Sequence, residues 1–245
     1  MTAWEIFIQQ FVTYEGYKTV LSGLLNTVII AVFGLIIGFI LGSIFAVIKS
    51  IPIYKNRGFK VFQYIVDLYV AVFRGTPMVV QLLIVHFILF PAMGVDFGSI
   101  IISQNFAIQG VVIEAIITFG LNSAAYISEI MRGGINSVDK GQLEAGRALG
   151  LSYGTAMVRI VVPQAVKNIV PTLGNEFITL IKETSVAGFI SVVDLTRAFQ
   201  NIANSTYEFI VPYLMLALFY LVLVILITLL IRLIERRLAK SDRSR

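Results

Sequence analysis

Four long apolar runs constrain this sequence more than any other feature. A transmembrane helix needs about 20 consecutive apolar residues, and the runs at about 23–48, 61–90, 107–128 and 208–234 each reach that length. A fifth run, at about 165–190, is interrupted by polar side chains, which are tolerated at membrane depth only where they are buried in protein or face water. The sequence therefore predicts an all-α integral membrane protein with five transmembrane helices. The interrupting residues are Asn175, Glu176, Lys182 and Glu183.

The composition agrees with this class and excludes several others. Hydrophobic residues make up 58% of the 245 residues and charged residues only 13%, which is far from a soluble globular composition. The chain has no cysteine, so disulfides, zinc-thiolate sites and cysteine nucleophiles are excluded. The first residues include Glu5 and lack a basic start, so we do not expect a secretory signal there.

Basic residues are concentrated in three parts of the chain: residues 49–60, residues 129–170 and the tail from Arg232 onward. The other connections hold Lys18 and Arg197 against four acidic residues. By the positive-inside rule the three basic regions are cytoplasmic, which predicts an external N-terminus and a cytoplasmic C-terminus. The net charge of +5 therefore reflects topology and contact with anionic lipid, and we do not expect a nucleic-acid partner.

Glycines recur at four-residue spacing in the first span, at Gly34, Gly38 and Gly42. This spacing places a stripe of small residues on one helix face and lets another helix approach closely. Ordinary packing within the chain is the favoured interpretation, and a dedicated dimer seam is the alternative.

Charged residues also occur inside or beside the predicted spans. The second span contains Arg74-Gly-Thr-Pro77, where proline breaks the hydrogen-bond ladder and kinks the helix. Arg74 either satisfies the broken helix or lines a substrate path, and the sequence favours neither. Glu129 and Arg132 are three residues apart, so we expect a structural ion pair on one helix face. The double glycine at 133–134 is then predicted to end this helix.

Residues 139–163 form a polar module between two apolar runs. Asp139 can cap a helix at about 140–149, in an arrangement with Gln142 that resembles a capping box. Gly150 is placed to end this helix in a left-handed conformation.

A second short helix follows in the same module. Ser152 can cap it, and it is predicted to stop at or just before Pro163. Taken alone, these residues leave two alternatives open: a solvated cytoplasmic loop or a rigid docking element. Two capped helices favour a fixed element over a long structureless loop.

The module resembles the signature loop of permease subunits in binding-protein-dependent ABC importers. The signature reads Glu-Ala-Ala, three residues, Gly, nine residues, Ile, one residue, Leu-Pro, and this chain has Gly for the third alanine and Val for the leucine. Other blocks resemble the polar amino acid branch of these permeases, of the histidine, glutamine and arginine type. The matching positions of the loop are Glu144, Ala145, Gly146, Gly150, Ile160 and Pro163, and the further blocks are "FRGTPMVVQ" (73–81), "LNSAAYISEIMRGGINSV" (121–138) and "IKETSVAGFISVVDL" (181–195).

This resemblance implies a fold, partners and a mechanism. The fold is that of a type I ABC importer permease, similar to the methionine importer permease, with five core helices and a cytoplasmic coupling helix. Such permeases pair with themselves or with a sister chain in the inner membrane. Each receives one ATPase subunit, two copies in all, and an extracytoplasmic amino acid-binding protein delivers the solute.

The resemblance also assigns segments and residues. Residues 1–22 are an external or interfacial lead, 23–235 the transmembrane domain with the coupling loop at about 139–163, and 236–245 a basic cytoplasmic tail. The chain contains no G-x-x-x-x-G-K-[ST] phosphate loop, so ATP and Mg²⁺ are expected in the partner ATPase, with no cofactor and no metal in this chain. We therefore expect a transporter subunit and not an enzyme. The residues expected to couple to the ATPase are Glu144, Ala145, Gly146, Arg147, Gly150 and Pro163.

Polar residues in the second, third and fourth spans are candidates for the substrate path. An amino acid zwitterion needs partners for its carboxylate and its ammonium group. Carboxylates are scarce among the candidates, so glutamine or glutamate is weakly favoured over a cationic substrate. The candidates are Arg74, Thr76, Gln81, His86, Asn122, Tyr126, Lys182, Glu183, Thr184 and Ser185.

His86 is the only histidine and has two interpretations. It is either a hydrogen-bonded structural residue or a specificity residue that donates to the solute. Glu114, near the outer end of the third span, is similarly open.

The main alternative function is an ion-coupled secondary transporter of small polar solutes. Such a protein often has inverted repeats, none of which is evident here, and five spans do not divide into two halves. A membrane hydrolase has no supporting catalytic spacing in this sequence.

Overall fold

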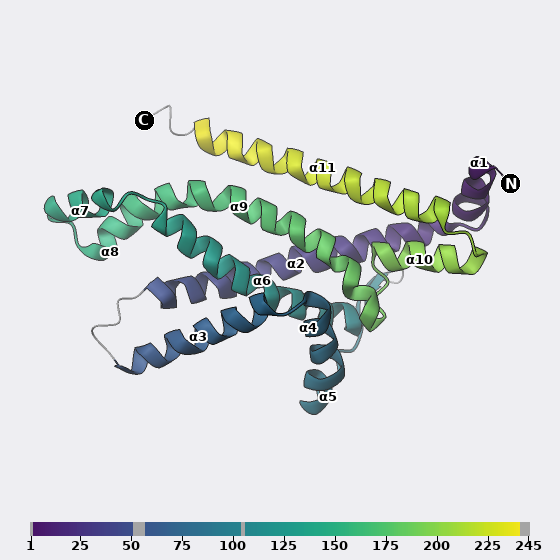
Figure 1. The fold of residues 1–245 in the computed structure, drawn as a ribbon, viewed down its shortest axis with the longest axis horizontal. Helices are drawn as coiled ribbons and strands as arrows, with labels where there is room; N and C mark the ends of the chain where they lie inside the picture. The colour runs from purple at the N-terminus through teal and green to yellow at the C-terminus, as the bar shows by residue number, and fades with distance from the viewer. Residues whose placement is uncertain (1, 51–56, 104–105, 241–245) are drawn as a thin grey trace.

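The computed structural model describes residues 2–50, 57–103 and 106–240, and Figure 1 shows their arrangement. Part of the predicted basic loop, including Lys55, and the end of the basic tail lie outside these residues. The elements are α1 (Ala3–Phe7), a π-helical turn (Ile8–Thr13), α2 (Gly16–Ser50), α3 (Arg57–Gly75), α4 (Met78–Ile84), a π-helical turn (Val85–Leu89), α5 (Phe90–Ala92), β1 (Ile100–Ser103), β2 (Phe106–Ile108), α6 (Gly110–Asn136), α7 (Lys140–Ala148), α8 (Tyr153–Ala156), a π-helical turn (Met157–Val161), α9 (Val162–Glu183), a 3₁₀ helix (Thr184–Ile190), α10 (Leu195–Thr206) and α11 (Ile210–Lys240).

Helices α2 and α6 form the central packed pair. The glycine stripe of α2 lies in this contact, where a Cβ atom on Gly38 would lie 2.7 Å from the Cβ of Ser123. A Cβ atom on Gly42 would likewise lie 2.9 Å from the carbonyl oxygen of Ala124. The small residues therefore serve packing within the chain, which confirms the favoured interpretation.

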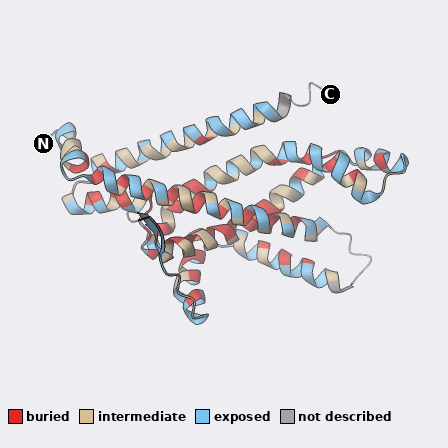
Figure 2. Cartoon of the chain, turned by 180° about the vertical axis from the view of Figure 1, so that it is seen from behind, coloured by how far each residue is buried: buried red, intermediate tan, exposed pale blue. Residues whose placement is uncertain are grey.

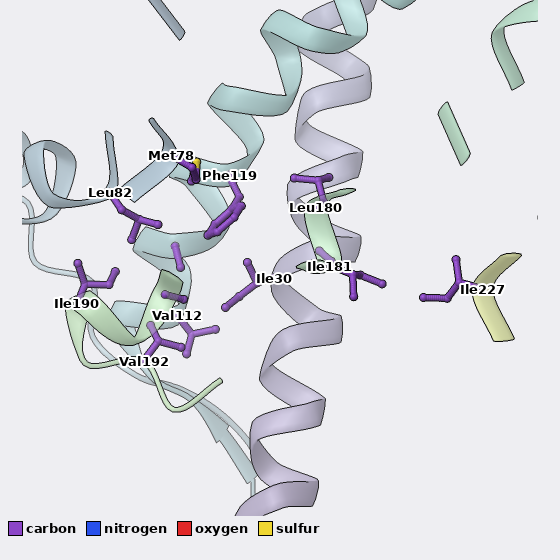
Figure 3. Close-up of a cluster of buried hydrophobic side chains, with 13 residues drawn as sticks. Ile30, Met78, Leu82, Val112, Phe119, Leu180, Ile181, Ile190, Val192 and Ile227 are labelled. Atoms are coloured by element: carbon purple, nitrogen blue, oxygen red, sulfur yellow. The ribbon is translucent and has the colours of Figure 1, made fainter. Parts of the chain in front are cut away.

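The largest apolar cluster surrounds this pair. Ile30 of α2 and Phe119 of α6 are fully buried in it, together with Leu82 of α4 and Ile181 of α9 (Figure 3). The cluster therefore joins the broken second span and the polar α9 to the central helices.

Helix α11 is different because most of its side chains are exposed. Figure 2 shows few buried positions along it, and only 6% of the most apolar 18-residue stretch of this helix is buried. Its long apolar surface suits contact with lipid tails.

The number of helices that qualify as spans is lower than predicted. Among the described residues, α2, α6 and the segment Ile210–Arg237 of α11 are long and apolar enough to cross a membrane. The pair α3 and α4–α5 gives a fourth candidate if it is counted as one span. Helix α9 has 22 residues and is about 33 Å long, which is a sufficient length, but its polar side chains keep it from qualifying by composition.

The second predicted span is not one helix. The segments Phe59–Gly75 and Met78–Ala92 meet at an angle of 112°. The prediction of a kink at Pro77 is confirmed, and the kink divides the apolar run at 61–90 into two helical segments. The break is sharp because Pro77 has an extended backbone and its ring nitrogen cannot donate to the preceding turn.

Two further boundaries differ from the predictions. Helix α6 continues through Gly133 and Gly134 to Asn136, because Gly134 is buried against Ile169 of α9 and serves packing instead of termination. Helix α2 begins at Gly16, seven residues before the apolar run at residue 23.

The predicted external connection at 191–207 contains helix α10. Asp194 is its N-cap, and its carboxylate accepts from the backbone N–H groups of Thr196 and Arg197. The preceding turn is fixed to α2, where Asn26 Nδ2 donates to the carbonyl of Val193. These side chain to backbone bonds explain why the connection is helical and tightly held.

Candidate functional site

The predicted coupling module, residues 139–163, is a capped helical element at one end of the molecule. Figure 1 shows α7 and α8 at the opposite end from α1 and α10. Asp139 Oδ1 accepts from the backbone N–H of Gly141 at 2.7 Å, which confirms Asp139 as the N-cap of α7. The capping-box partner is wrong: the side-chain oxygen of Gln142 accepts from Gln164 Nε2 of α9 at 3.4 Å.

The C-terminal end of α7 follows the prediction. Gly150 has φ +85°, the left-handed region that favours glycine. Its N–H donates to the carbonyl of Arg147 at 3.0 Å, and the N–H of Leu151 donates to Gly146 at 3.2 Å. These bonds satisfy carbonyls that would otherwise be free at the helix end.

The two faces of α7 have different surroundings. Gly146 is buried, and a Cβ atom there would lie 2.7 Å from Ile160 Cδ1 and 3.4 Å from the Cβ of Ala156. The opposite face is exposed, including Leu149 with 84% of its surface accessible. The exposed residues of α7 and its C-cap are Lys140, Gly141, Gln142, Glu144, Ala145, Arg147, Ala148 and Leu149.

Pro163 does not end a helix. The segment from α8 passes through the π-helical turn Met157–Val161 into α9, and Pro163 lies in the first turn of α9. Pro163 is tolerated there because the first residues of a helix have no internal partner for their N–H groups, so a proline loses no hydrogen bond. The segment that begins at α8 is therefore continuous with α9.

Helix α9 has a continuous polar exposed face. The exposed polar residues recur at intervals of four, three, four and three, which places them on one side of the helix. The opposite side, with Ile169, Leu180 and Ile181, is buried. Since hydrocarbon does not solvate polar groups, this face must contact water or another protein. The polar face consists of Asn168, Thr172, Asn175, Thr179 and Lys182.

Five of the predicted path residues meet at the break between α3 and α4: Arg74, Thr76, Gln81, Asn122 and Tyr126. Gln81 Nε2 donates to the carbonyls of Phe73 at 2.8 Å and Thr76 at 3.0 Å. The oxygen of Gln81 accepts from Asn122 Nδ2 at 2.8 Å. Gln81 and Asn122 are buried and satisfy the carbonyls that Pro77 leaves free. They therefore hold the break together.

Arg74 and Thr76 remain exposed at the same break. The guanidinium of Arg74 lies 5.5 Å from the ring centre of Tyr126, a cation–π contact with α6. Arg74 thus has a stabilising partner and a free charged edge.

The other predicted path residues lie elsewhere. His86 Nδ1 is 2.5 Å from Glu114 Oε2, so the histidine from the π-helical turn is paired with α6. Thr184 is buried and donates to the carbonyl of Ile181. Glu183 and Ser185 are partly buried beside it. The histidine and these three residues are not joined by hydrogen bonds to the residues at the break.

Glu176 was not identified as a path residue from the sequence. It lies on α9 beside the polar face, is partly buried, and accepts from Ser123 Oγ at 3.2 Å. A carboxylate within an apolar run, directly after Asn175 of the polar face, was the signal that could have located it.

The predicted pair of Glu129 and Arg132 is part of a larger cluster. Arg132 Nη2 lies 2.6 Å from Glu129 Oε2, and Lys49 Nζ lies 2.7 Å from Glu129 Oε1. Lys49 also lies 2.8 Å from Asp67 Oδ1, so one ammonium group joins α2, α3 and α6. A cavity of about 630 Å³ lies beside this cluster and the start of α7.

The comparison with known proteins gives the family. Residues 34–240 match the family described as "Binding-protein-dependent transport system inner membrane component". The chain belongs to this family. It is therefore a multi-pass inner-membrane permease subunit of an ABC importer, and it is not an enzyme, since ATP hydrolysis belongs to a separate ATPase. Membership also rules out the ion-coupled secondary transporter.

The relatives of this permease are named for amino acid transport. The arginine transport system permease protein ArtQ of Bacillus subtilis is 41% identical over 91% of this chain and 94% of the relative. A permease protein of Rickettsia bellii that is named for a glutamine transport system is 37% identical over 91% of this chain and 94% of the relative. The permease is accordingly assigned to amino acid import.

Solved structures support the same fold. One, titled as an amino acid ABC transporter with histidines, has a TM-score of 0.78 and 34% identity, and covers 93% of this chain and 98% of that chain. A structure of the MetNI methionine ABC transporter has a TM-score of 0.67 at 19% identity, and covers 94% and 97%. The predicted type I importer fold, similar to the methionine importer permease, is thereby confirmed.

Proposed function

We propose that this permease forms one half of an alternating-access path for a polar amino acid, with the polar face of α9 lining that path. The observation that carries the proposal is the exposed row of Asn168, Thr172, Asn175, Thr179 and Lys182 on a helix among apolar ones. A row of this kind is stable at membrane depth only against water or protein. A second permease subunit, identical or a sister chain, supplies the other wall.

The coupling role falls to α7. Its exposed face enters a groove of the ATPase, with Glu144 and Arg147 as charged contacts and Leu149 as an apolar anchor. Gly150 fixes the direction in which the helix ends, and Pro163 begins the helix that carries movement to the path. ATP and Mg²⁺ bind in the ATPase.

The orientation follows from this arrangement. The end with α7 and the C-terminus is cytoplasmic, and the end with α1 and α10 is external. An extracytoplasmic binding protein delivers the amino acid to that external end.

The exposed charges favour glutamine or glutamate as substrate. Arg74 and Lys182 are exposed cations that suit carboxylate groups, while the carboxylates of Glu176 and Glu183 are partly buried. Glu176 is the residue that would accommodate a cationic side chain. ATP-driven uptake of radiolabelled glutamine, glutamate and arginine in proteoliposomes decides between them, and tightest uptake of arginine would overturn this choice.

Substitution on α9 tests the path. Thr179 and Thr228 of α11 each donate to the carbonyl four residues earlier, at 3.0 Å and 2.7 Å, so they are matched in local structure. We expect Thr179→Leu to reduce ATP-driven uptake by roughly tenfold through loss of polar lining, and Thr228→Leu to leave it within about twofold. Equal uptake by the two variants would contradict the role of α9.

A further inference from the structure

Two adjoining cavities lie at the end of the molecule opposite the coupling module, between the N-terminal segment and the end of α10. Their volumes are about 170 Å³ and 450 Å³. Both are lined by Gln10, Tyr14, Ser205 and Thr206, so we treat them as one external pocket. Glu208 lines the larger part.

The lining of the external pocket is rich in hydrogen-bond acceptors. It contains the carboxylate of Glu208, and none of the described lining residues is a lysine or an arginine. No described hydrogen bond or ion pair engages the Glu208 carboxylate. A carboxylate without a partner favours a cation.

Gln10 supplies a second, independent observation. It is only 2% exposed, its Nε2 donates to Thr206 Oγ1 at 2.7 Å, and its oxygen Oε1 has no hydrogen-bond partner. A buried acceptor without a partner is costly, and a bound donor would remove that cost.

An unpaired carboxylate and an unpaired amide oxygen, both in the lining of the larger cavity, select a hydrogen-bond donor that carries positive charge.

The surroundings of the pocket are typical of a protein contact. Tyr14 lines it and is 62% exposed, and Tyr207, which lies between the lining residues Thr206 and Glu208 in the chain, is 85% exposed. Aromatic residues are enriched where proteins bind one another. Residues 1–19 and 201–209 also hold three acids and one base, against a net charge of +5 for the whole chain.

We propose that the external pocket receives a lysine or arginine side chain of the extracytoplasmic binding protein. Glu208 pairs with the cationic head, and the amide oxygen of Gln10 accepts one of its hydrogens. This proposal rests on the proposed function, because it requires a binding protein that docks at the external end.

The test uses the complete transporter in nanodiscs with its ATPase and its binding protein. The half-saturating concentration of binding protein for stimulated ATP hydrolysis is measured for Glu208→Gln, for Glu208→Asp and for Asp96→Asn. Asp96 is an exposed acid in the connection before α6 that lines neither cavity, so it is the matched control. We expect Glu208→Gln to raise the half-saturating concentration roughly tenfold without changing the maximal rate, and the other two variants to behave as wild type.

Each other outcome has a definite meaning. An unchanged half-saturating concentration in Glu208→Gln overturns the docking proposal while leaving the importer function in place. An equal rise in Asp96→Asn shows general electrostatic attraction and also overturns it. Binding of free arginine to the wild-type permease, lost in Glu208→Gln while docking is unchanged, assigns the pocket to a small cation instead. Absence of any binding-protein stimulation in wild type overturns the proposed function itself.

Discussion

The end of the coupling helix offers the sharpest test of how this permease is driven. Gly150 has φ +85°, and a Cβ atom placed on it would meet no atom within 4 Å. A substitution there therefore acts through the backbone conformation alone, without steric clash. A substitution at Gly150 therefore tests the direction in which α7 ends without changing the side-chain contacts of the helix.

The expected cost of each substitution follows from that geometry. An L-residue other than asparagine or aspartate in the left-handed region loses about 1–2 kcal/mol, so Gly150→Ala should partly unfold the turn. Gly150→Asn should cost less, since asparagine tolerates this region. Gly150→Pro is the most severe, because proline fixes φ near −65° and its nitrogen cannot donate to Arg147, as Gly150 does at 3.0 Å.

The assay is ATP-driven amino acid uptake in proteoliposomes that contain the ATPase and the binding protein. We expect no uptake for Gly150→Pro, a loss of about fivefold to tenfold for Gly150→Ala, and near-normal uptake for Gly150→Asn. Membrane insertion should be normal in all three, because the turn lies outside the apolar helices. Gly154→Ala is the matched control, since Gly154 also has open space around a Cβ atom and its φ is negative.

Two results would refute this reasoning. Wild-type uptake in Gly150→Pro would show that the end of α7 is not required for coupling. Equal losses in Gly150→Ala and Gly154→Ala would show that the left-handed conformation has no special role.

Two further predictions concern stability. Gly38→Ala should lower the thermal unfolding midpoint by several degrees relative to Gly133→Ala. A Cβ atom on Gly38 would lie 2.7 Å from Ser123, and overpacking of this kind costs about 1–3 kcal/mol, whereas a Cβ atom on Gly133 would meet open space. Equal unfolding midpoints of the two variants in detergent would contradict close packing between α2 and α6. Burial raises the pKa of Asp194 from 3.8 to about 6, although backbone N–H groups oppose the rise. The folded state then holds this proton more tightly than the unfolded state, so wild-type stability should fall as pH rises from about 4 to 6, by roughly 3 kcal/mol at most. The Asp194→Asn variant should not lose stability over this pH range. If its unfolding midpoint changes with pH in parallel with that of the wild type, Asp194 is not the group responsible.

The parts of the fold that the sequence predicts are those with local causes. Apolar runs give the spans, and Asp139 and Gly150 give both ends of α7, because a cap and a left-handed residue act within a few positions. The break at Pro77 also has a local cause, the proline itself. The hydrogen bonds that stabilise the break could not be predicted, because Gln81 and Asn122 are 41 residues apart and meet only when α4 folds onto α6.

The same distinction explains what was missed at the candidate site. The exposed row of α9 is a periodic pattern, visible in principle from residue spacing, but exposure becomes known only when the buried side is packed. The pair of His86 and Glu114 joins residues 28 positions apart, and Lys49 reaches Glu129 over 80 positions. No local rule relates such residues, so intramembrane charges could be marked as candidates without their partners.

Three glycines near the coupling module show why residue type alone was insufficient. Gly134 was expected to end α6, yet it lies in the contact with α9 and the helix passes through it. Gly146 stands where the signature loop that this module resembles has an alanine, at a cost of up to about 1 kcal/mol in helix propensity, and it packs closely against Ile160 and Ala156. Only Gly150 of the three has a positive φ. A glycine thus ends a helix where the chain must turn, and continues it where a neighbour must come close. In this module the second use fixes α7 on the segment that leads into α9, and the first sets the direction in which the chain leaves α7.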